Sequence, residues 1–113
     1  MIQIIHNPRC SKSREGLTYL NENNIEYQII AYLDNPLTQE EIKDVLKKLN
    51  ISPIDLIRKN EAIWKDNYKN LSLSDDEIID AMVEYPKLIE RPIFINGNKA
   101  VIGRPTERIT EIL

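Results

Sequence analysis

The chain has 113 residues, a formal net charge of −3, 42% hydrophobic residues and 29% charged residues. This length and balance predict one folded domain spanning residues 1–113, and they argue against a disordered chain. The negative charge gives no general attraction to nucleic acid or to an anionic membrane, so we expect no direct binding to either.

The first third of the chain predicts a β-α-β unit. Residues 2–5 are three isoleucines and one glutamine, a short β-branched run followed by Asn7-Pro8, which indicates a buried strand that ends in a turn. The apolar spacing of residues 10–22 favours a helix, and residues 27–32 form a second β-rich run. Because one helix separates the two strands, we expect them to be parallel neighbours with a right-handed crossover.

Residues 38–88 predict a helical insertion. Two pairs fit a capping box ahead of an apolar run: Thr38 with Glu41, and Ser74 with Glu77. Ser52-Pro53 supplies a cap and a first-turn proline for a further helix, which would carry Arg58. Residues 60–73 are less regular and suggest a short helix and a loop.

The last part of the chain predicts a hairpin and a terminal helix. Asn96-Gly97-Asn98 separates two apolar runs, which is a strong hairpin signal. An amphipathic helix carrying Ile109, Ile112 and Leu113 would follow. The order β-α-β, helices, β-β-α is that of an α/β thioredoxin-like fold with a mixed four-stranded sheet. Pro92 precedes the third strand, where that fold commonly has a cis proline.

Cys10 is the only cysteine, and it opens the first predicted helix. A single cysteine excludes an internal disulfide, and one cysteine with one histidine argues against a metal site. A lone cysteine is commonly an inert buried residue, but cationic neighbours and a helix N-terminus would stabilise its thiolate. We therefore interpret Cys10 as a nucleophile. Together with a start that has no basic leader, it predicts a reducing, cytoplasmic setting.

Three neighbours are candidates to tune the thiol: His6, Ser13 and Arg14. A cationic His6 would lower the thiol pKa, a neutral one could act as a base or orient a partner, and either role competes with that of an ordinary strand-end histidine. Ser13 could donate a hydrogen bond to the sulfur, and Arg14 lies one helical turn from Cys10. Free backbone N–H groups at the start of the helix could bind an anion.

Three further arginines are candidate oxyanion ligands: Arg58, Arg91 and Arg104. Each alone could be an ordinary surface charge. In a thioredoxin-like fold, however, the turn before the third strand approaches the cysteine loop, which favours Arg91 and Arg104. Planar guanidinium groups bind tetrahedral oxyanions with two hydrogen bonds each, which lysine does less well.

These residues resemble the glutaredoxin-coupled arsenate reductase (ArsC) family, whose fold the Spx-type transcription regulators share. The similar segments cover essentially the whole chain in the family's order: residues 6–14, Tyr32-Leu33 with Pro36-Leu37-Thr38, residues 56–60, Glu90-Arg91-Pro92-Ile93 and residues 103–107. The resemblance implies that Cys10 attacks arsenate while Arg58, Arg91 and Arg104 hold the oxyanion. It implies that His6, Ser13 and Arg14 tune or frame the thiol. Arg9 departs from the family pattern, which has a small residue before the nucleophile.

The reaction implied by the resemblance is reduction of arsenate to arsenite. Glutathione would be the co-substrate, glutaredoxin would resolve a mixed disulfide on Cys10, and no cofactor would be bound. Because the chain has no second cysteine, the reductant must come from another molecule. The residue six positions after Cys10 is Gly16, which excludes the unrelated class that has an arginine there in a phosphatase-type loop.

Two alternative functions use the same residues. A Spx-type regulator would bind RNA polymerase, but those regulators typically sense oxidants through Cys-x-x-Cys, which here reads Cys10-Ser11-Lys12-Ser13. A general glutathione-linked thiol oxidoreductase would use the arginines to bind glutathione carboxylates. The sequence favours the arsenate reductase because the arginines suit an oxyanion.

Overall fold

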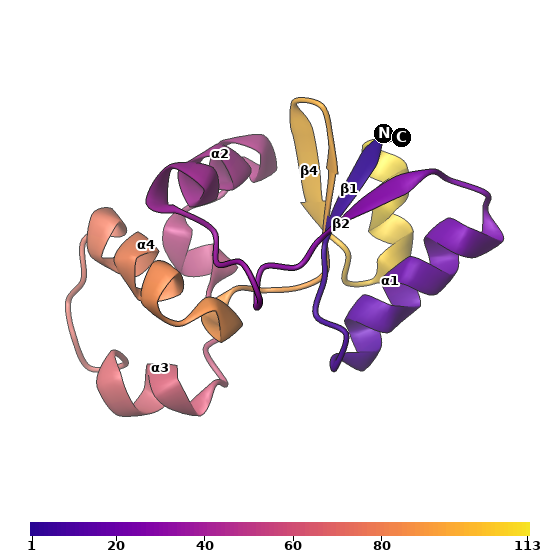
Figure 1. The fold of residues 1–113 in the computed structure, drawn as a ribbon. Helices are drawn as coiled ribbons and strands as arrows, with labels where there is room; N and C mark the ends of the chain where they lie inside the picture. Colours follow the sequence, from indigo (N-terminus) through magenta and orange to yellow (C-terminus); the bar gives the residue numbers. More distant parts are fainter. The chain divides into compact units, whose positions relative to one another are not determined.

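The computed structural model describes residues 1–113 (Figure 1). The chain divides into two compact units, one of Met1–Asn35 with Arg91–Leu113 and the other of Pro36–Glu90. The first unit contains all four strands, and the second consists of helices and their connections. None of the helices is both long enough and apolar enough to cross a membrane.

The first unit is built on a mixed four-stranded sheet in the order β2-β1-β3-β4. The strands are β1 (Ile2–Ile5), β2 (Tyr27–Ile30), β3 (Ile93–Asn96) and β4 (Lys99–Ile102). β1 pairs in parallel with β2 and antiparallel with β3, as the predicted β-α-β unit and hairpin require. Gly97 turns the hairpin with φ of +61°, a conformation that glycine adopts without steric cost. The second strand ends at Ile30, two residues earlier than predicted.

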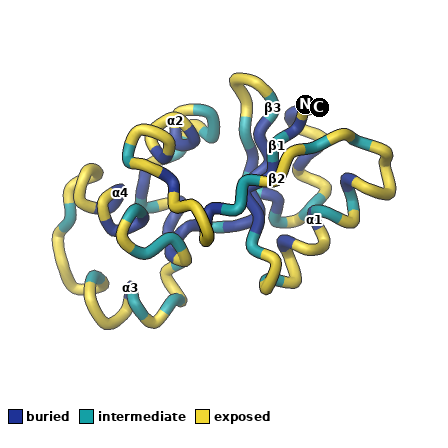
Figure 2. Tube along the Cα trace, in the orientation of Figure 1, coloured by how far each residue is buried: buried dark blue, intermediate teal, exposed yellow.

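Helix α1 (Ser11–Glu22) packs on this sheet through a cluster of fully buried side chains. Ile4, Leu20, Phe94 and Ile109 are each 0% exposed, and Figure 2 shows the burial concentrated along β1 and β3. A Cβ on Gly16 would lie 3.1 Å from the ring of Phe94, so α1 approaches the sheet closely at that point. This approach fixes the height of the first turn of α1, and therefore of Cys10, above the end of β1.

The terminal helix differs from the predicted one. It is a 3₁₀ helix, η3 (Thr106–Glu111), which lies beside α1 (Figure 1). In 3₁₀ geometry residues three apart share a face, so Ile109 and Ile112 are both buried. Leu113, which the amphipathic pattern groups with these two isoleucines, lies beyond η3 and is 61% exposed. Both Arg91–Pro92, as expected, and Arg104–Pro105 are cis peptide bonds.

The second unit contains three α-helices: α2 (Gln39–Leu49), α3 (Ala62–Asn67) and α4 (Asp75–Glu84). Both predicted capping boxes are present, with reciprocal bonds between cap and third-residue side chains. The helix predicted after Ser52 is only a short 3₁₀ turn, η1 (Pro53–Leu56), and η2 (Pro86–Leu88) is another. The prediction that Arg58 lies in a helix is therefore wrong. Ile57 is extended and bridges to Ile89, which ends the helical turn before Arg58.

Candidate active site

Cys10 is the N-cap residue of α1, at the end of the loop that follows β1. Its backbone N–H donates to the Asn7 carbonyl at 3.1 Å, and its carbonyl accepts from Arg14 N–H at 3.0 Å. The loop is a turn shaped by the Asn7 side chain, whose Oδ1 accepts from Arg9 N–H at 3.0 Å. The half-buried thiol does not cap the helix with a hydrogen bond as a serine hydroxyl would.

The surroundings of Cys10 favour its thiolate. Burial by itself raises the pKa of the Cys10 thiol, but hydrogen bonding from the Ser13 backbone and the positive charge of Arg91 oppose it. Hydrogen bonds from the Lys12 backbone and the Arg91 side chain add to them, and the net result is a pKa below the ordinary cysteine value. Lys12 and Ser13 act here through their backbone N–H groups at the start of α1.

Ser13 and His6 form a buried pair behind the thiol. Ser13 is 0% and His6 6% exposed, and the Ser13 hydroxyl lies 2.6 Å from His6 Nδ1. The same hydroxyl accepts from Asn7 N–H at 3.0 Å. The hydroxyl is thus engaged by the loop, and it is the Ser13 backbone that stabilises the sulfur. The pair holds the start of α1 against the end of β1.

Of the charge states considered for His6, the structure favours the neutral ring. Burial and the nearby charge of Arg14 lower the pKa of His6, and hydrogen bonding to the Ser13 backbone only partly offsets them. Arg14 itself is exposed, and its Nη1 donates to the Pro8 carbonyl at 3.1 Å, which ties α1 to the loop before Cys10. The cation that acts on the thiolate is therefore Arg91 rather than His6.

Arg91 and Arg104 both lie in the unit that carries Cys10. Arg91 is 9% exposed and interacts with the sulfur through its charge and its hydrogen bonding. Arg104 is half-buried and shares the wall of a cavity of about 340 Å³ with Lys12 and Glu15 from the first turns of α1. The structure thus brings His6, Ser13, Arg14 and Arg91 around Cys10 and places Arg104 beside the start of α1.

Arg58 belongs to the other unit, where carboxylates surround it. Its Nη1 lies 3.4 Å from Glu61 and donates to the Lys87 carbonyl at 3.3 Å, and its Nε lies 4.0 Å from Glu90. An oxyanion that bound Arg58 would compete with those carboxylates.

Sequence reasoning missed one participant, Asn7, whereas the backbone N–H groups at the start of the helix, including that of Lys12, were expected to stabilise an anion. The Asn-Pro pair was visible as a turn signal, but its bonds to Arg9 and Ser13 depend on the loop conformation. The structure contains no group of three or more His, Cys, Asp or Glu residues that could hold a metal ion.

The ArsC family model matches residues 5–112 of this chain. The chain belongs to the ArsC family. The uncharacterized protein YfgD of Escherichia coli K12 is 46% identical, over 99% of this chain and 96% of its own length. An arsenate reductase of Haemophilus influenzae is 45% identical over 97% of each chain. The structure of an arsenate reductase from Vibrio cholerae superposes with a TM-score of 0.94 at 42% identity, covering 99% of this chain and 97% of that one. The fold is accordingly thioredoxin-like.

Proposed function

We propose that this chain reduces arsenate to arsenite with the Cys10 thiolate as nucleophile. Glutathione would donate the electrons, and glutaredoxin in the same cytoplasm would regenerate the thiol. The observation that carries the proposal is a thiol of lowered pKa, at the start of a helix and in hydrogen-bonding contact with Arg91. Relatives that bear the name arsenate reductase support the choice of oxyanion.

Binding comes first, because an anionic nucleophile approaches an anion only when cations neutralise the charge between them. Arg91 lies against the sulfur, and Arg104 lies near the first turn of α1. We assign these two arginines to the arsenate oxygens, with Arg14 at the edge of the site. Arg58, the third arginine that the family resemblance implies, would bind an oxyanion only by displacing its carboxylate partners.

The chemical steps form and break bonds at sulfur. The Cys10 thiolate attacks arsenic(V), an arsenate oxygen leaves as water after taking protons from solvent, and an S–As bond remains. A glutathione thiolate then attacks the Cys10 sulfur, and both electrons of the S–As bond stay on arsenic, which departs as arsenite, arsenic(III). The resulting mixed disulfide transfers its glutathione to a glutaredoxin thiolate, which releases Cys10 as a thiolate.

His6 and Ser13 serve this reaction by position. Their 2.6 Å contact sets the loop so that the Ser13 backbone faces the sulfur. A neutral His6 adds no positive charge beside Ser13, so the arginines alone supply the positive charge that holds the oxyanion.

The test is an assay in which arsenate, glutathione, glutaredoxin and glutathione reductase couple arsenate reduction to NADPH oxidation. Wild type is compared with Cys10→Ser, and with Ser11→Ala as a matched control on the exposed start of α1. We expect Cys10→Ser to abolish arsenate-dependent NADPH oxidation, because serine is not ionised at neutral pH, and Ser11→Ala to retain it. Arsenate reduction that survives in Cys10→Ser contradicts the mechanism, and a wild type without arsenate-dependent turnover contradicts the substrate.

A further inference from the structure

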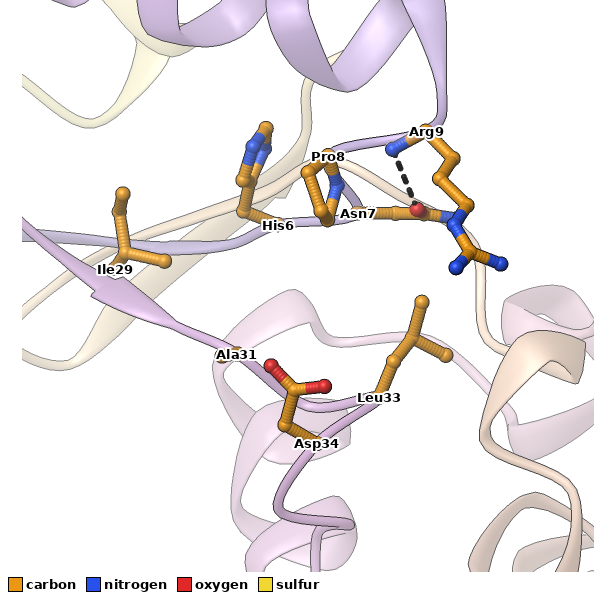
Figure 3. Close-up of a pocket in the computed structure, with 8 residues that line it drawn as sticks. All are labelled: His6, Asn7, Pro8, Arg9, Ile29, Ala31, Leu33 and Asp34. Carbon is orange, nitrogen blue, oxygen red and sulfur yellow. Dashed lines mark hydrogen bonds between the residues drawn. The ribbon is translucent and has the colours of Figure 1, made fainter.

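A second cavity lies on the β2 side of the Cys10 loop (Figure 3). Its volume is about 430 Å³, within the range of small-molecule sites. Residues 6–9, which lead directly to Cys10, form one wall, and Ile29, Ala31, Leu33 and Asp34 form the other. β2 is an edge strand of the sheet, so this wall is open to ligands, with Ile29 46% and Leu33 37% exposed.

The cavity combines an apolar wall with two opposite charges. Ile29, Ala31 and Leu33 supply aliphatic surface, while the side chains of Arg9 and Asp34 turn toward the space between the walls (Figure 3). Both charged residues are exposed, and neither side chain takes part in an ion pair within the chain. A ligand that offers an anionic group, a cationic group and an aliphatic portion within a short span would complement this lining.

We propose that this cavity binds the thiol co-substrate, a small zwitterionic thiol peptide of the glutathione class. Arg9 receives a carboxylate of the peptide, Asp34 receives its ammonium group, and its aliphatic part lies on Leu33 and Ile29. Because Arg9 adjoins Cys10 in the chain, a tripeptide, about 10 Å when extended, reaches from the cavity to the sulfur. The inference rests on the proposed function in taking Cys10 as the reacting thiol.

The charges also argue that this cavity is separate from the oxyanion site. The carboxylate of Asp34 would repel arsenate, whereas Arg91 places a positive charge at the sulfur and does not line this cavity. Oxyanion and thiol peptide would thus occupy different sides of Cys10. That arrangement suits the second chemical step, in which the glutathione thiolate attacks the Cys10 sulfur from one side while arsenic leaves from the other.

The experiment measures mixed-disulfide formation at Cys10 without arsenate. The Cys10 thiolate attacks a disulfide, the S–S bond breaks, and one half leaves as a thiolate while the other stays on Cys10. Rates are followed by mass spectrometry with glutathione disulfide and with uncharged 2-hydroxyethyl disulfide. The ratio of the two rate constants cancels any change in the reactivity of the thiol itself.

We expect this ratio to fall about threefold in Arg9→Gln and in Asp34→Asn, and about tenfold in the double variant. Lys99→Gln and Glu26→Gln are the matched controls, since both residues are exposed in the same unit outside the cavity, and they should keep the wild-type ratio. A double variant with the wild-type ratio overturns the proposal. The proposal is also overturned if the double variant keeps the wild-type ratio of rate constants but is reduced slowly by glutaredoxin. The cavity would then be a protein-binding surface. Since no arsenate is present, failure of the arsenate chemistry leaves this result unaffected.

Discussion

At the scale of single residues, the reactivity of Cys10 depends on groups that are distant in sequence. Arg91 lies two residues before β3, and it opposes the effect of burial on the thiol pKa. His6 lies four positions before Cys10, but burial lowers its pKa and favours the neutral ring. Its contact with Ser13 fixes the start of α1 next to the end of β1. The thiol is therefore activated by the Ser13 backbone at the start of α1 together with the Arg91 guanidinium, and not by a histidine cation.

The pH dependence of alkylation tests this assignment. Only the thiolate reacts with iodoacetamide, so the rate rises as the pH passes upward through the Cys10 pKa. Since that pKa is lowered in the folded protein, the wild-type profile should rise at a lower pH than that of a free thiol. Arg91→Gln should move the profile to higher pH, because the stabilising charge is lost.

The matched control is Arg108→Gln, which removes an exposed arginine paired with Glu111 on η3. Its profile should coincide with that of wild type. A profile for Arg91→Gln that also coincides with wild type would show that Arg91 does not stabilise the thiolate.

At the scale of elements, the packing of α1 on the sheet positions the sulfur. The helix touches Phe94, Pro92 and Ile4 through the space left by Gly16, at 3.1, 3.3 and 3.4 Å from where a Cβ would lie. Phe94 is held from the other side as well, because a Cβ on Gly103 would lie 2.3 Å from its ring. Two glycines thus let one aromatic ring fill the region between α1, β3 and the residues after β4.

Gly16→Ala is expected to destabilise the protein, by about 1–3 kcal/mol, because the added methyl overpacks the core against Phe94. In an unhindered helix the same change would stabilise by about 1 kcal/mol, so the sign distinguishes the two situations. The measurement is urea unfolding followed by circular dichroism. Thr18→Ala, at an exposed position of α1, is the control and should not destabilise. Increased stability in Gly16→Ala would contradict the close approach.

At the scale of the whole molecule, the candidate site residues are divided between two units. Cys10, His6, Ser13, Arg14, Arg91 and Arg104 belong to the unit with the sheet, and Arg58 belongs to the helical unit. The helical unit has its own buried residues, among them Ile42, Leu56, Met82 and Leu88, each about 1% exposed or less. Arg58 is the candidate oxyanion ligand that lies outside the unit of Cys10.

Kinetics of Arg58→Ala test whether Arg58 contributes to the oxyanion site. Loss of a charged hydrogen-bonding partner should raise KM for arsenate about tenfold or more. The alkylation profile of Cys10 should stay unchanged, because Arg58 is not among the groups that shift the thiol pKa. Lys59→Ala, an exposed neighbour, should leave KM at the wild-type value. An unchanged KM in Arg58→Ala would restrict the oxyanion site to the first unit.

Much of the fold follows from local signals that the sequence carries openly. Capping boxes at Thr38 and Ser74, the Asn-Gly turn at Gly97 and the β-branched run of β1 each depend on residues within one turn or one strand. Local signals fail where tertiary contacts compete with them. Ile57 pairs with Ile89 and stops a helix that its neighbours favour, and the C-terminal segment forms the 3₁₀ helix η3 with Ile109 and its C-cap residue Ile112 buried.

The sequence alone determined the chemistry that is available: one cysteine at a helix start, one histidine and a set of arginines. Only the tertiary structure decided which of them act on the sulfur. It brought Arg91 to the thiol, turned the Ser13 hydroxyl to His6 and placed Arg9 opposite Asp34 across a cavity. The reason is physical: a pKa or a binding site depends on distances and burial between residues that are far apart in the chain, and these exist only once the sheet has formed.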